Sequence, residues 1–252
     1  MKQRYERPDL LNRLIELEAV VAYRKSAPSE KRPFAYTAGH IPVLLSAPHG
    51  TAHRRNGRYK GEDEYTTAFA RLVAAETGAH VLYSRYRLDT DPNWDRQAPY
   101  KDTLQQIVRR QKIGFVLDIH GMSNRHKIGI VLGTINGRSC PAYEPLIIRT
   151  LQARQFKQTT QEQAHQFEAL KWDHFVVNHS RFTGGVTSHT VTRFVTEEVG
   201  VAAAQFELCA AVRVARRCGN GRRPATFYGN SRGIARTIGA FVVLVQMLAA
   251  QL

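Results

Sequence analysis

The N-terminal part of the chain has the apolar spacing of a surface helix. Residues 8–25 carry four leucines and a valine three and four residues apart, and this period predicts an α-helix with one apolar face. Residues 26–33 are polar and include two prolines, which is typical of a linker. The pattern predicts an N-terminal helix and linker, residues 1–33, that packs on the main domain or on a second subunit.

The main domain, residues 34–252, contains short apolar runs bounded by Gly, Pro and polar residues. Runs of this length and composition are typical of buried strands. One of them, TVTRFVT, alternates between apolar and polar residues at period two. Strands are predicted at residues 41–45, 79–84, 114–119, 128–132, 175–177, 190–196 and 201–208.

The segments between these strands have helical spacing and helix-terminal signals. Gly78 can cap one helix at its C-terminus, Pro99 can open another, and Asn230 or Ser231 can cap the last. Strands interleaved with helices predict an α/β fold, a three-layer sandwich around a mixed, mostly parallel central sheet. Helices are predicted at residues 64–76, 99–112, 141–156 and over the apolar run 238–248, and a loop or an exposed helix at 158–166.

Composition narrows the class of protein. The chain has 252 residues, 43% of them apolar, which is enough for a large core. No apolar run approaches the ~18 residues of a membrane span, and the N-terminus lacks the uncharged stretch of a signal peptide. Cys140, Cys209 and Cys218 show no CxxC spacing. We therefore expect a cytoplasmic protein with no membrane span and no cysteine zinc site.

The chain is strongly basic, with a formal net charge of +15 and a pI near 10.1. Such a charge suits an acidic substrate or a nucleic-acid surface, or it simply keeps the protein soluble. No RNA-binding, zinc-finger or helix-turn-helix signature is present, so these interpretations stay open. The basic residues are densest in two runs: Arg54, Arg55, Arg58 and Lys60, and Arg213, Arg216, Arg217, Arg222 and Arg223.

Residues that can bind a metal ion follow the strand predicted at 41–45. His49 stands just after this strand, where open α/β sheets hold their ligands, and Glu62, Asp63 and Glu64 open the next helix. A histidine on a strand end and an acid on the next helix can bind one metal ion. The same acids would also suit the positive end of a helix without any metal.

The strand predicted at 114–119 leads into Asp118 and His120. Side chains two residues apart lie on one face of a strand. A neutral imidazole at a strand end is a good zinc ligand, and Asp118 can orient it. The alternative is a core histidine that is satisfied by Asp118.

Two further strand ends carry polar residues of complementary type. Glu207, two residues after Gln205, could act beside a metal ion as general base and then as general acid. After the strand at 79–84 come Arg85, Asn93 and Arg96, which could hold a substrate carboxylate. A surface glutamate and a solvated polar loop are the alternatives, but four such strand ends favour a site.

In this order the motifs resemble those of the N-formylglutamate amidohydrolase family, whose fold is related to zinc carboxypeptidases and succinylglutamate desuccinylases. The resemblance covers residues 41–208 and the closing helix, and it leaves the N-terminal helix unexplained. The motifs are PHG, KGEDEYT, SRYRLDTDPNWD with YK, LDIHG, GG with a nearby Ser, and GVAAAQFEL.

The resemblance implies one zinc ion held by His49, His120 and an acid, either Glu62 or Asp63. The spacing of Asp63 to Thr66 slightly favours Asp63. In zinc carboxypeptidases the acid stands three residues after the first histidine, a position that Ala52 fills in this chain. The carboxylate must therefore come from further along the sequence.

The resemblance also implies roles for residues around the zinc. Glu207 matches the catalytic carboxylate, and Arg85 or Arg96 the arginine that recognises the substrate carboxylate. His53 is a further candidate ligand or a loop residue.

Two hypotheses follow. The first is a zinc-dependent amidohydrolase that cleaves an N-acyl amino acid or a peptide at an amide bond, with a small acidic or peptidic substrate held by Arg85, Asn93 and Arg96. The second is a protein that binds polyanions or nucleic acid on an inactivated hydrolase scaffold. Only the first requires about one zinc per chain.

Overall fold

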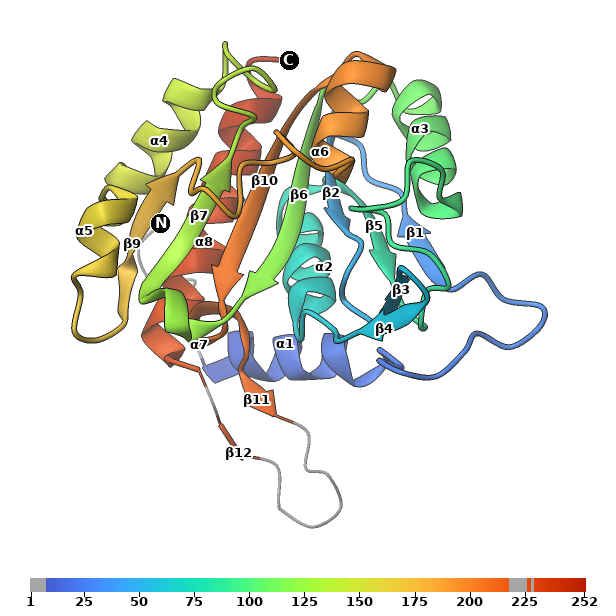
Figure 1. Cartoon of the computed structure of the whole chain (residues 1–252), viewed down its shortest axis with the longest axis horizontal. Helices are drawn as coiled ribbons and strands as arrows, with labels where there is room; N and C mark the ends of the chain where they lie inside the picture. The colour runs from blue at the N-terminus through green and yellow to red at the C-terminus, as the bar shows by residue number, and fades with distance from the viewer. Residues whose placement is uncertain (1–7, 218–225, 228) are drawn as a thin grey trace.

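Eight strands form one mixed sheet at the centre of the computed structural model, which describes residues 8–217, 226–227 and 229–252 (Figure 1). The four central strands are parallel to one another, and the mixed, mostly parallel sheet that the sequence predicts is confirmed. In sheet order the strands are β1 (Phe34–Thr37), β5 (His80–Ser84), β2 (Val43–Ala47), β6 (Phe115–Met122), β10 (Ala202–Cys209), β7 (Ile128–Gly133), β9 (Lys171–Val177) and β8 (Lys157–Gln158).

Strand directions place all central carboxyl ends at one edge. β1 and β7 run antiparallel to their neighbours β5 and β10, while β9 and β8 are parallel to β7. The arrowheads of β6 and β10 point to the lower edge in Figure 1, where the first helix and a small hairpin lie. The polar residues that follow β2 and those near the carboxyl ends of β6 and β10 therefore meet at this edge.

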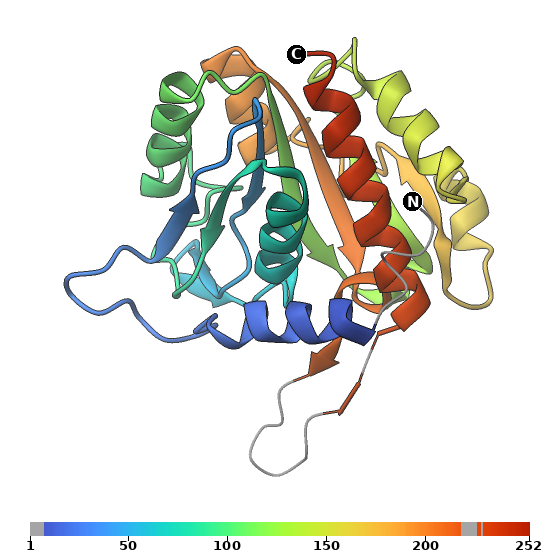
Figure 2. The same ribbon diagram turned by 180° about the vertical axis from the view of Figure 1, so that it is seen from behind.

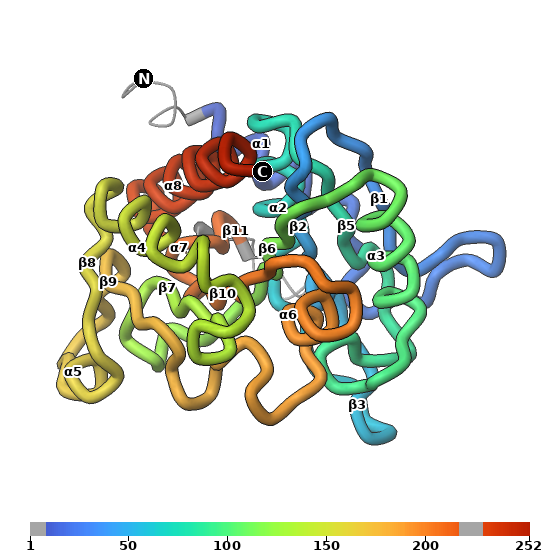
Figure 3. The backbone as a smooth tube through the Cα atoms, turned by 90° about the horizontal axis from the view of Figure 1, so that it is seen from above, coloured from blue at the N-terminus to red at the C-terminus, as the bar shows by residue number. Residues whose placement is uncertain are grey.

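Helices cover both faces of the sheet, so the fold has three layers (Figures 2 and 3). In the main domain the helix boundaries agree with the predicted ones within a few residues, and Asn230 caps the last helix by accepting from Gly233 N. The N-terminal helix, predicted over residues 8–25, ends already at Ala19. One layer contains α2 (Thr66–Thr77), α4 (Glu144–Ala153) and α8 (Ser231–Ala249), and the other α3 (Pro99–Arg110) and α6 (Val191–Phe194).

Strand residues alternate between two buried clusters. Leu117 and Phe206 belong to the cluster that includes α2 and α8, whereas Val116 and Ala203 pack with α3 and α6. A strand that is buried on both faces has a continuous apolar run in its sequence. Because side chains alternate along a strand, Asp118, His120, Gln205 and Glu207 face the α3 and α6 layer.

The N-terminal helix α1 (Pro8–Ala19) packs against α2. Leu10 and Leu14 are buried in the same cluster as α2, and Arg13 pairs with Glu76 at 2.6 Å. Glu18 accepts hydrogen bonds from Tyr65 N and Ala68 N, at the N-terminus of α2, where no local side chain provides a cap. The contact with the main domain is thus specific. Domain separation at residue 33 and oligomerisation through this helix stay predictions.

The prediction of a strand at residues 190–196 is wrong. This segment forms α6, followed by the π-helical turn η2 (Val195–Val199). Thr190 accepts from Arg193 N as an N-cap, and Val191, Phe194 and Val195 are buried together against α3. Apolar spacings of three and four were present beside the period-two pattern, and packing on the sheet selects the helix.

Several short elements were not expected from the sequence. Residues 158–166 were predicted to form a loop or an exposed helix, and they contain a short helix. Cys218, Arg222 and Arg223 lie outside the described residues. The short elements are the hairpin β3 (His53–Arg55) and β4 (Arg58–Lys60), η1 (Asn124–His126), α5 (Gln161–His165), α7 (Ala210–Arg213), β11 (Arg216–Arg217) and β12 (Thr226–Phe227), besides β1 and β8.

Helix α8 corrects the expectation that no apolar segment reaches membrane-span length. Its 19 residues have a mean hydropathy of 1.4 and pass that test by length and composition. However, 61% of this apolar stretch of α8 is buried within the protein. Phe241, for example, packs edge-on against both Phe69 and Phe206. The apolar surface of α8 is used as part of the core.

Candidate metal centre

His49 lies just beyond the carboxyl end of β2 and is 6% exposed. Its two ring nitrogens face two different carboxylates. Nε2 is 2.8 Å from Asp91 Oδ1, and Nδ1 is 3.8 Å from Asp63 Oδ2. The Asp91 bond fixes the ring so that Nδ1 is directed towards Asp63.

His120, in β6, has the same arrangement. Its Nδ1 is 3.4 Å from Asp63 Oδ2, and its Nε2 is 3.1 Å from Asp118 Oδ2. Asn93 Nδ2 also lies 2.9 Å from this Nε2. The two imidazole rings are in edge contact, with centroids 4.8 Å apart, so two Nδ1 atoms and one carboxylate oxygen converge.

Asp63 is held in place from the backbone. Its N–H donates to His49 O at 2.8 Å, and Gly121 N donates to its Oδ2 at 3.0 Å. Helix α2 begins at Thr66, so Asp63 stands in the loop before the helix. Asp63, His49 and His120 together form a group whose donor atoms lie within 4.8 Å of one another.

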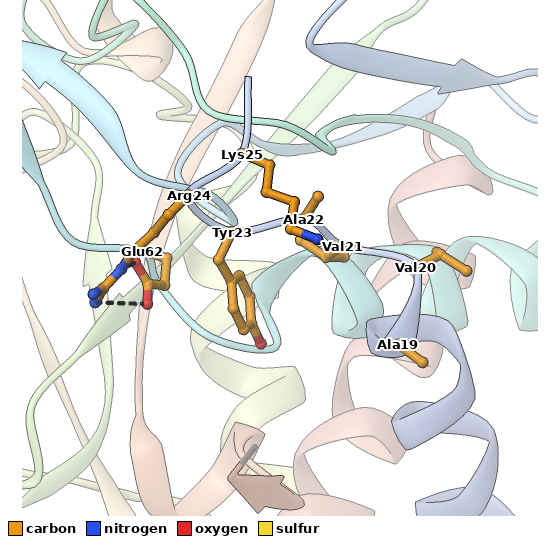
Figure 4. A pocket seen from close by; sticks show the side chains of 8 residues that line it. All are labelled: Ala19, Val20, Val21, Ala22, Tyr23, Arg24, Lys25 and Glu62. Carbon is orange, nitrogen blue, oxygen red and sulfur yellow. Dashed lines mark hydrogen bonds and ion pairs between the residues drawn. The ribbon is translucent and has the colours of Figure 1, made fainter. Parts of the chain in front are cut away.

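Glu62 points to a different part of the surface. Its carboxylate pairs with the guanidinium of Arg24 at 3.1 Å (Figure 4). It lines a surface hollow of about 400 Å³ whose other walls come from residues 19–25. Of the two acids that the sequence left open, the structure brings Asp63 to the histidines and leaves Glu62 with Arg24.

Asp63 and His120 favour each other's charged form. Burial raises the pKa of Asp63, but the hydrogen bond from His120 and the charges of His49 and Arg213 outweigh it, so the net shift is downward. Burial lowers the pKa of His120, but Asp118 and Asp63 raise it well above its ordinary value. The two carboxylates therefore favour the protonated form of His120.

Asp91 organises the other side of His49. This fully buried carboxylate accepts from Arg55 Nε at 2.5 Å and from Asn93 N at 2.8 Å, in addition to its bond with His49. His53 stacks on His49 with centroids 3.8 Å apart, and its Nε2 is 3.4 Å from Asp91 Oδ2. Burial and the His49 charge lower the pKa of His53 to about 4.

His49, His53 and Asp91 thus form a second group with metal-binding donors. The charge of Asp91 is already matched by Arg55, and its other oxygen is shared by His49 and a backbone N–H. Among the described residues, Asp63 pairs with the rings of His49 and His120 and with no arginine or lysine. The group of His49, Asp63 and His120 is therefore the better candidate for a metal site, and Asp91 holds the ring of His49 beside it.

Glu207 lies beside His120 across the parallel pair of β10 and β6. It is 7% exposed, and Gln205 Nε2 donates to its Oε1 at 2.7 Å. Burial raises the pKa of Glu207 to about 7, although the charge of His120 opposes the shift. A carboxyl group with this pKa exchanges protons readily near neutral pH.

The three residues predicted to hold substrate are placed differently. Asn93 is buried, and its Oδ1 accepts from Val191 N, so its amide links His120 to α6. Arg85 stacks on Tyr86, and its backbone pairs with Pro33 and Ala22. Arg96 is exposed. In the described chain, no hydrogen bond joins Arg85 or Arg96 to the histidines.

Arg213, in α7, lies next to the candidate site, although the sequence does not single it out for a role there. It is 6% exposed, and a Cβ placed on Gly121 would lie 2.3 Å from its Nη2. Among the described residues neither its Nε nor its Nη1 has a hydrogen-bond partner. Its place just after strand β10 was the available signal in the sequence, but Arg213 also belongs to a basic run.

Comparison with known proteins identifies the fold. No family model matches the sequence, and no curated protein matches it. N-formylglutamate amidohydrolase from Ralstonia eutropha JMP134 has a TM-score of 0.50 and 15% identity, with 87% of this chain and 98% of that chain covered. The fold prediction is thereby confirmed: the chain shares its fold with an amidohydrolase.

Two other solved structures are more distant. A bacteriophage poly-γ-glutamate hydrolase has a TM-score of 0.43 and 11% identity, covering 89% of this chain and 91% of that chain. A metallo-carboxypeptidase from Pseudomonas aeruginosa has a TM-score of 0.43 and 14% identity, covering 97% and 69%.

Proposed function

We propose that the chain is a zinc-dependent amidohydrolase that cleaves an N-acyl amino acid or a peptide at an amide bond. The observation that carries the proposal is the convergence of His49 Nδ1 and His120 Nδ1 on Asp63 Oδ2, at the carboxyl edge of an amidohydrolase fold. The role of each residue in the reaction is part of the proposal.

The donor set fits zinc. Two imidazole nitrogens and one carboxylate leave a fourth tetrahedral position open, as catalytic zinc sites require. Asp91 and Asp118 hold the remaining ring nitrogens of His49 and His120, which fixes the ring orientation and raises the basicity of the ligands. Zinc bound there would supply Lewis acidity and would lower the pKa of a bound water molecule to about 7.

Glu207 moves the proton. As a carboxylate it accepts a proton from the attacking water, and as a carboxylic acid it delivers that proton to the nitrogen of the leaving amine. The hydrogen bond from Gln205 Nε2 to Oε1 leaves Oε2 for this exchange. Glu207 is buried in β10 beside His120 of β6, which limits the access of bulk water to the step.

Arg213 supports recognition of a substrate carboxylate. A buried guanidinium without a bonded acid is costly, and a carboxylate from the substrate would satisfy it through charge-assisted hydrogen bonds. We favour Arg213 for this role over Arg85 and Arg96, because it lies against Gly121 and influences Asp63 electrostatically. Asn93 then positions His120 and α6.

Zinc analysis and a catalytic variant together test the proposal. The purified protein should contain about one zinc per chain and hydrolyse members of a panel of N-acyl amino acids and short peptides. Glu207→Gln should keep the zinc and lose ~10²–10⁴-fold in turnover, the usual contribution of a positioned acid-base group. A protein that hydrolyses these amides equally well after chelation would contradict the proposal.

A cytoplasmic location is part of the proposal. Cys140 and Cys209 are buried free thiols, and burial raises the pKa of both, that of Cys140 to about 12. Thiols of this kind are unreactive and persist in a reducing compartment.

A further inference from the structure

The basic hairpin, residues 53–60, links the part of the chain that carries His49 to the part that carries Asp63. Its strands β3 and β4 are joined by Asn56 and Gly57, which have φ values of 49° and 75° as a type I′ turn requires. The sequence HRRNGRYK contains no acid. Arg54, Arg58 and Lys60 are exposed.

The base of the basic hairpin is anchored in the metal centre. His53 stacks on His49, and Arg55 bonds Asp91. From His53 the strand rises about 3.3 Å per residue, so the turn lies about 10 Å from the site. The hairpin stands at the carboxyl edge of the sheet (Figure 1). A chain that leaves the metal centre in this direction would run along its cations.

Arg55 pairs with Asp91, but the exposed cations of the basic hairpin form no such ion pair with the described residues. In the part of the chain that the structure describes, no ion pair includes Arg54, Arg58 or Lys60. Two nearby carboxylates have neutral hydrogen-bond donors as partners instead: Asp89 accepts from Tyr59 OH, and Asp95 accepts from Asp91 N. A cluster of exposed cations without ion-pair partners attracts an anionic partner.

The aromatic residues of this surface indicate which anionic polymer fits. Tyr59 and Trp94 are 47% and 44% exposed. The guanidinium of Arg87 lies 4.3 Å from the Tyr59 ring, and that of Arg55 lies 5.3 Å from the Trp94 ring. Single-stranded nucleic acid is held by stacking of bases on open aromatic faces. Here an arginine covers one face of each ring, which leaves less aromatic surface for bases to stack on. Recognition of the partner's charge therefore dominates over stacking.

We propose that the basic hairpin is a docking surface for an acidic polypeptide whose amide bond lies at the metal centre. The inference rests on the proposed hydrolase function and defines its substrate as a polymer with repeated carboxylates. An extended chain advances about 3.3–3.6 Å per residue. Acidic residues about three positions from the cleaved bond would therefore reach the cations at the turn.

Binding can be measured without hydrolysis, using zinc-loaded full-length Glu207→Gln and fluorescently labelled oligo-L-glutamates of two and eight residues. A triple variant of the hairpin, Arg54→Gln, Arg58→Gln and Lys60→Gln, is added to this background. We expect it to lose tenfold or more in affinity for the longer probe at low salt, since each exposed pair contributes roughly a few-fold. Affinity for the short probe should change less than twofold.

The matched control removes three exposed charges at the end of α3, by Arg109→Gln, Arg110→Gln and Lys112→Gln. It should leave the affinity for both probes unchanged within twofold. Equal losses in the two triple variants would show non-specific charge and overturn the proposal, as would tighter binding of a single-stranded DNA with the same number of charges. If the protein holds no zinc and cleaves no amide while the hairpin still selects the longer probe, the proposed function fails and the docking surface stands.

Discussion

His49 Nε2 is hydrogen-bonded to Asp91 Oδ1 at 2.8 Å, although the two residues are 42 positions apart in the sequence. The bond turns the imidazole so that Nδ1 faces Asp63. Asp118 does the same for His120. In the proposed site the metal affinity depends on these two carboxylates as well as on the ligands.

Asp91→Asn should weaken zinc binding by ~10–100-fold, because an amide leaves the charge of Arg55 unmatched and can present the wrong group to His49. Competition with a calibrated chelator measures the dissociation constant. Asp89→Asn is the matched control, since the carboxylate of Asp89 accepts a hydrogen bond from Tyr59 OH and lies outside the group of metal-binding residues. Equal zinc affinity in the two variants would show that Asp91 does not orient a ligand.

Asp63→Asn and Glu62→Gln should separate the two acids that the sequence left open. We expect Asp63→Asn to be purified without stoichiometric zinc, since it removes one of three ligands. Glu62→Gln breaks the ion pair with Arg24, which is 76% exposed, so zinc content should stay at about one per chain. Metal analysis of both proteins decides the assignment, and retention of full zinc in both would place the carboxylate ligand elsewhere.

Zinc binding should release about one proton from His120. The pKa of His120 is raised above its ordinary value in the metal-free protein, so the folded protein binds a proton that the unfolded chain gives up earlier as pH rises. That stabilisation is complete below the ordinary pKa and is lost as pH rises through the raised one. Below the raised pKa, zinc competes with this proton, and affinity should increase about tenfold per pH unit.

Calorimetry in buffers with different ionisation enthalpies measures the number of protons released. His126→Asn is the control, because its side chain lies outside the metal centre and burial lowers its pKa. This variant should release the same number of protons as the parent. A release of zero protons near neutral pH would mean that His120 is neutral before the metal binds.

The polar residues near the strand ends could be predicted from the sequence, because the pattern that marks them lies in the residues just before them. His49, His120 and Glu207 each follow an apolar run, and the alternation of side chains decides which face they share. The choice between Glu62 and Asp63 is not local. It depends on the hydrogen bonds of Asp63 with His49 O and Gly121 N, which exist only after β2 and β6 have paired.

The arginines show the same limit. Arg85 and Arg213 both follow a strand, but Arg85 stacks on Tyr86 whereas Arg213 lies against Gly121. Nothing in the neighbouring residues distinguishes them, since the direction of a long side chain depends on what packs around it. The segment 190–196 fails for a related reason: its spacing suits both a strand and a helix, and contact with α3 selects the helix.

Arg213→Gln should impair the recognition of a substrate carboxylate more than the chemical step. Loss of a charge-assisted hydrogen bond costs about 1.5–3 kcal/mol, so KM for a substrate with a free carboxylate near the cleaved bond should rise roughly 10–150-fold. For the matching carboxamide, parent and variant should have similar KM values. The difference between the two substrates separates recognition of charge from a general disturbance of the site.

Thermal unfolding gives an independent measure for the same residue. A buried guanidinium without a bonded acid lowers the free energy of unfolding, so Arg213→Met should leave the ligand-free protein as stable as the parent or more stable. A residue that only braced α7 would behave in the opposite way, with a lower Tm and equal losses on both substrates. Substitutions that keep the fold and abolish the preference for the carboxylate would therefore assign Arg213 to substrate binding.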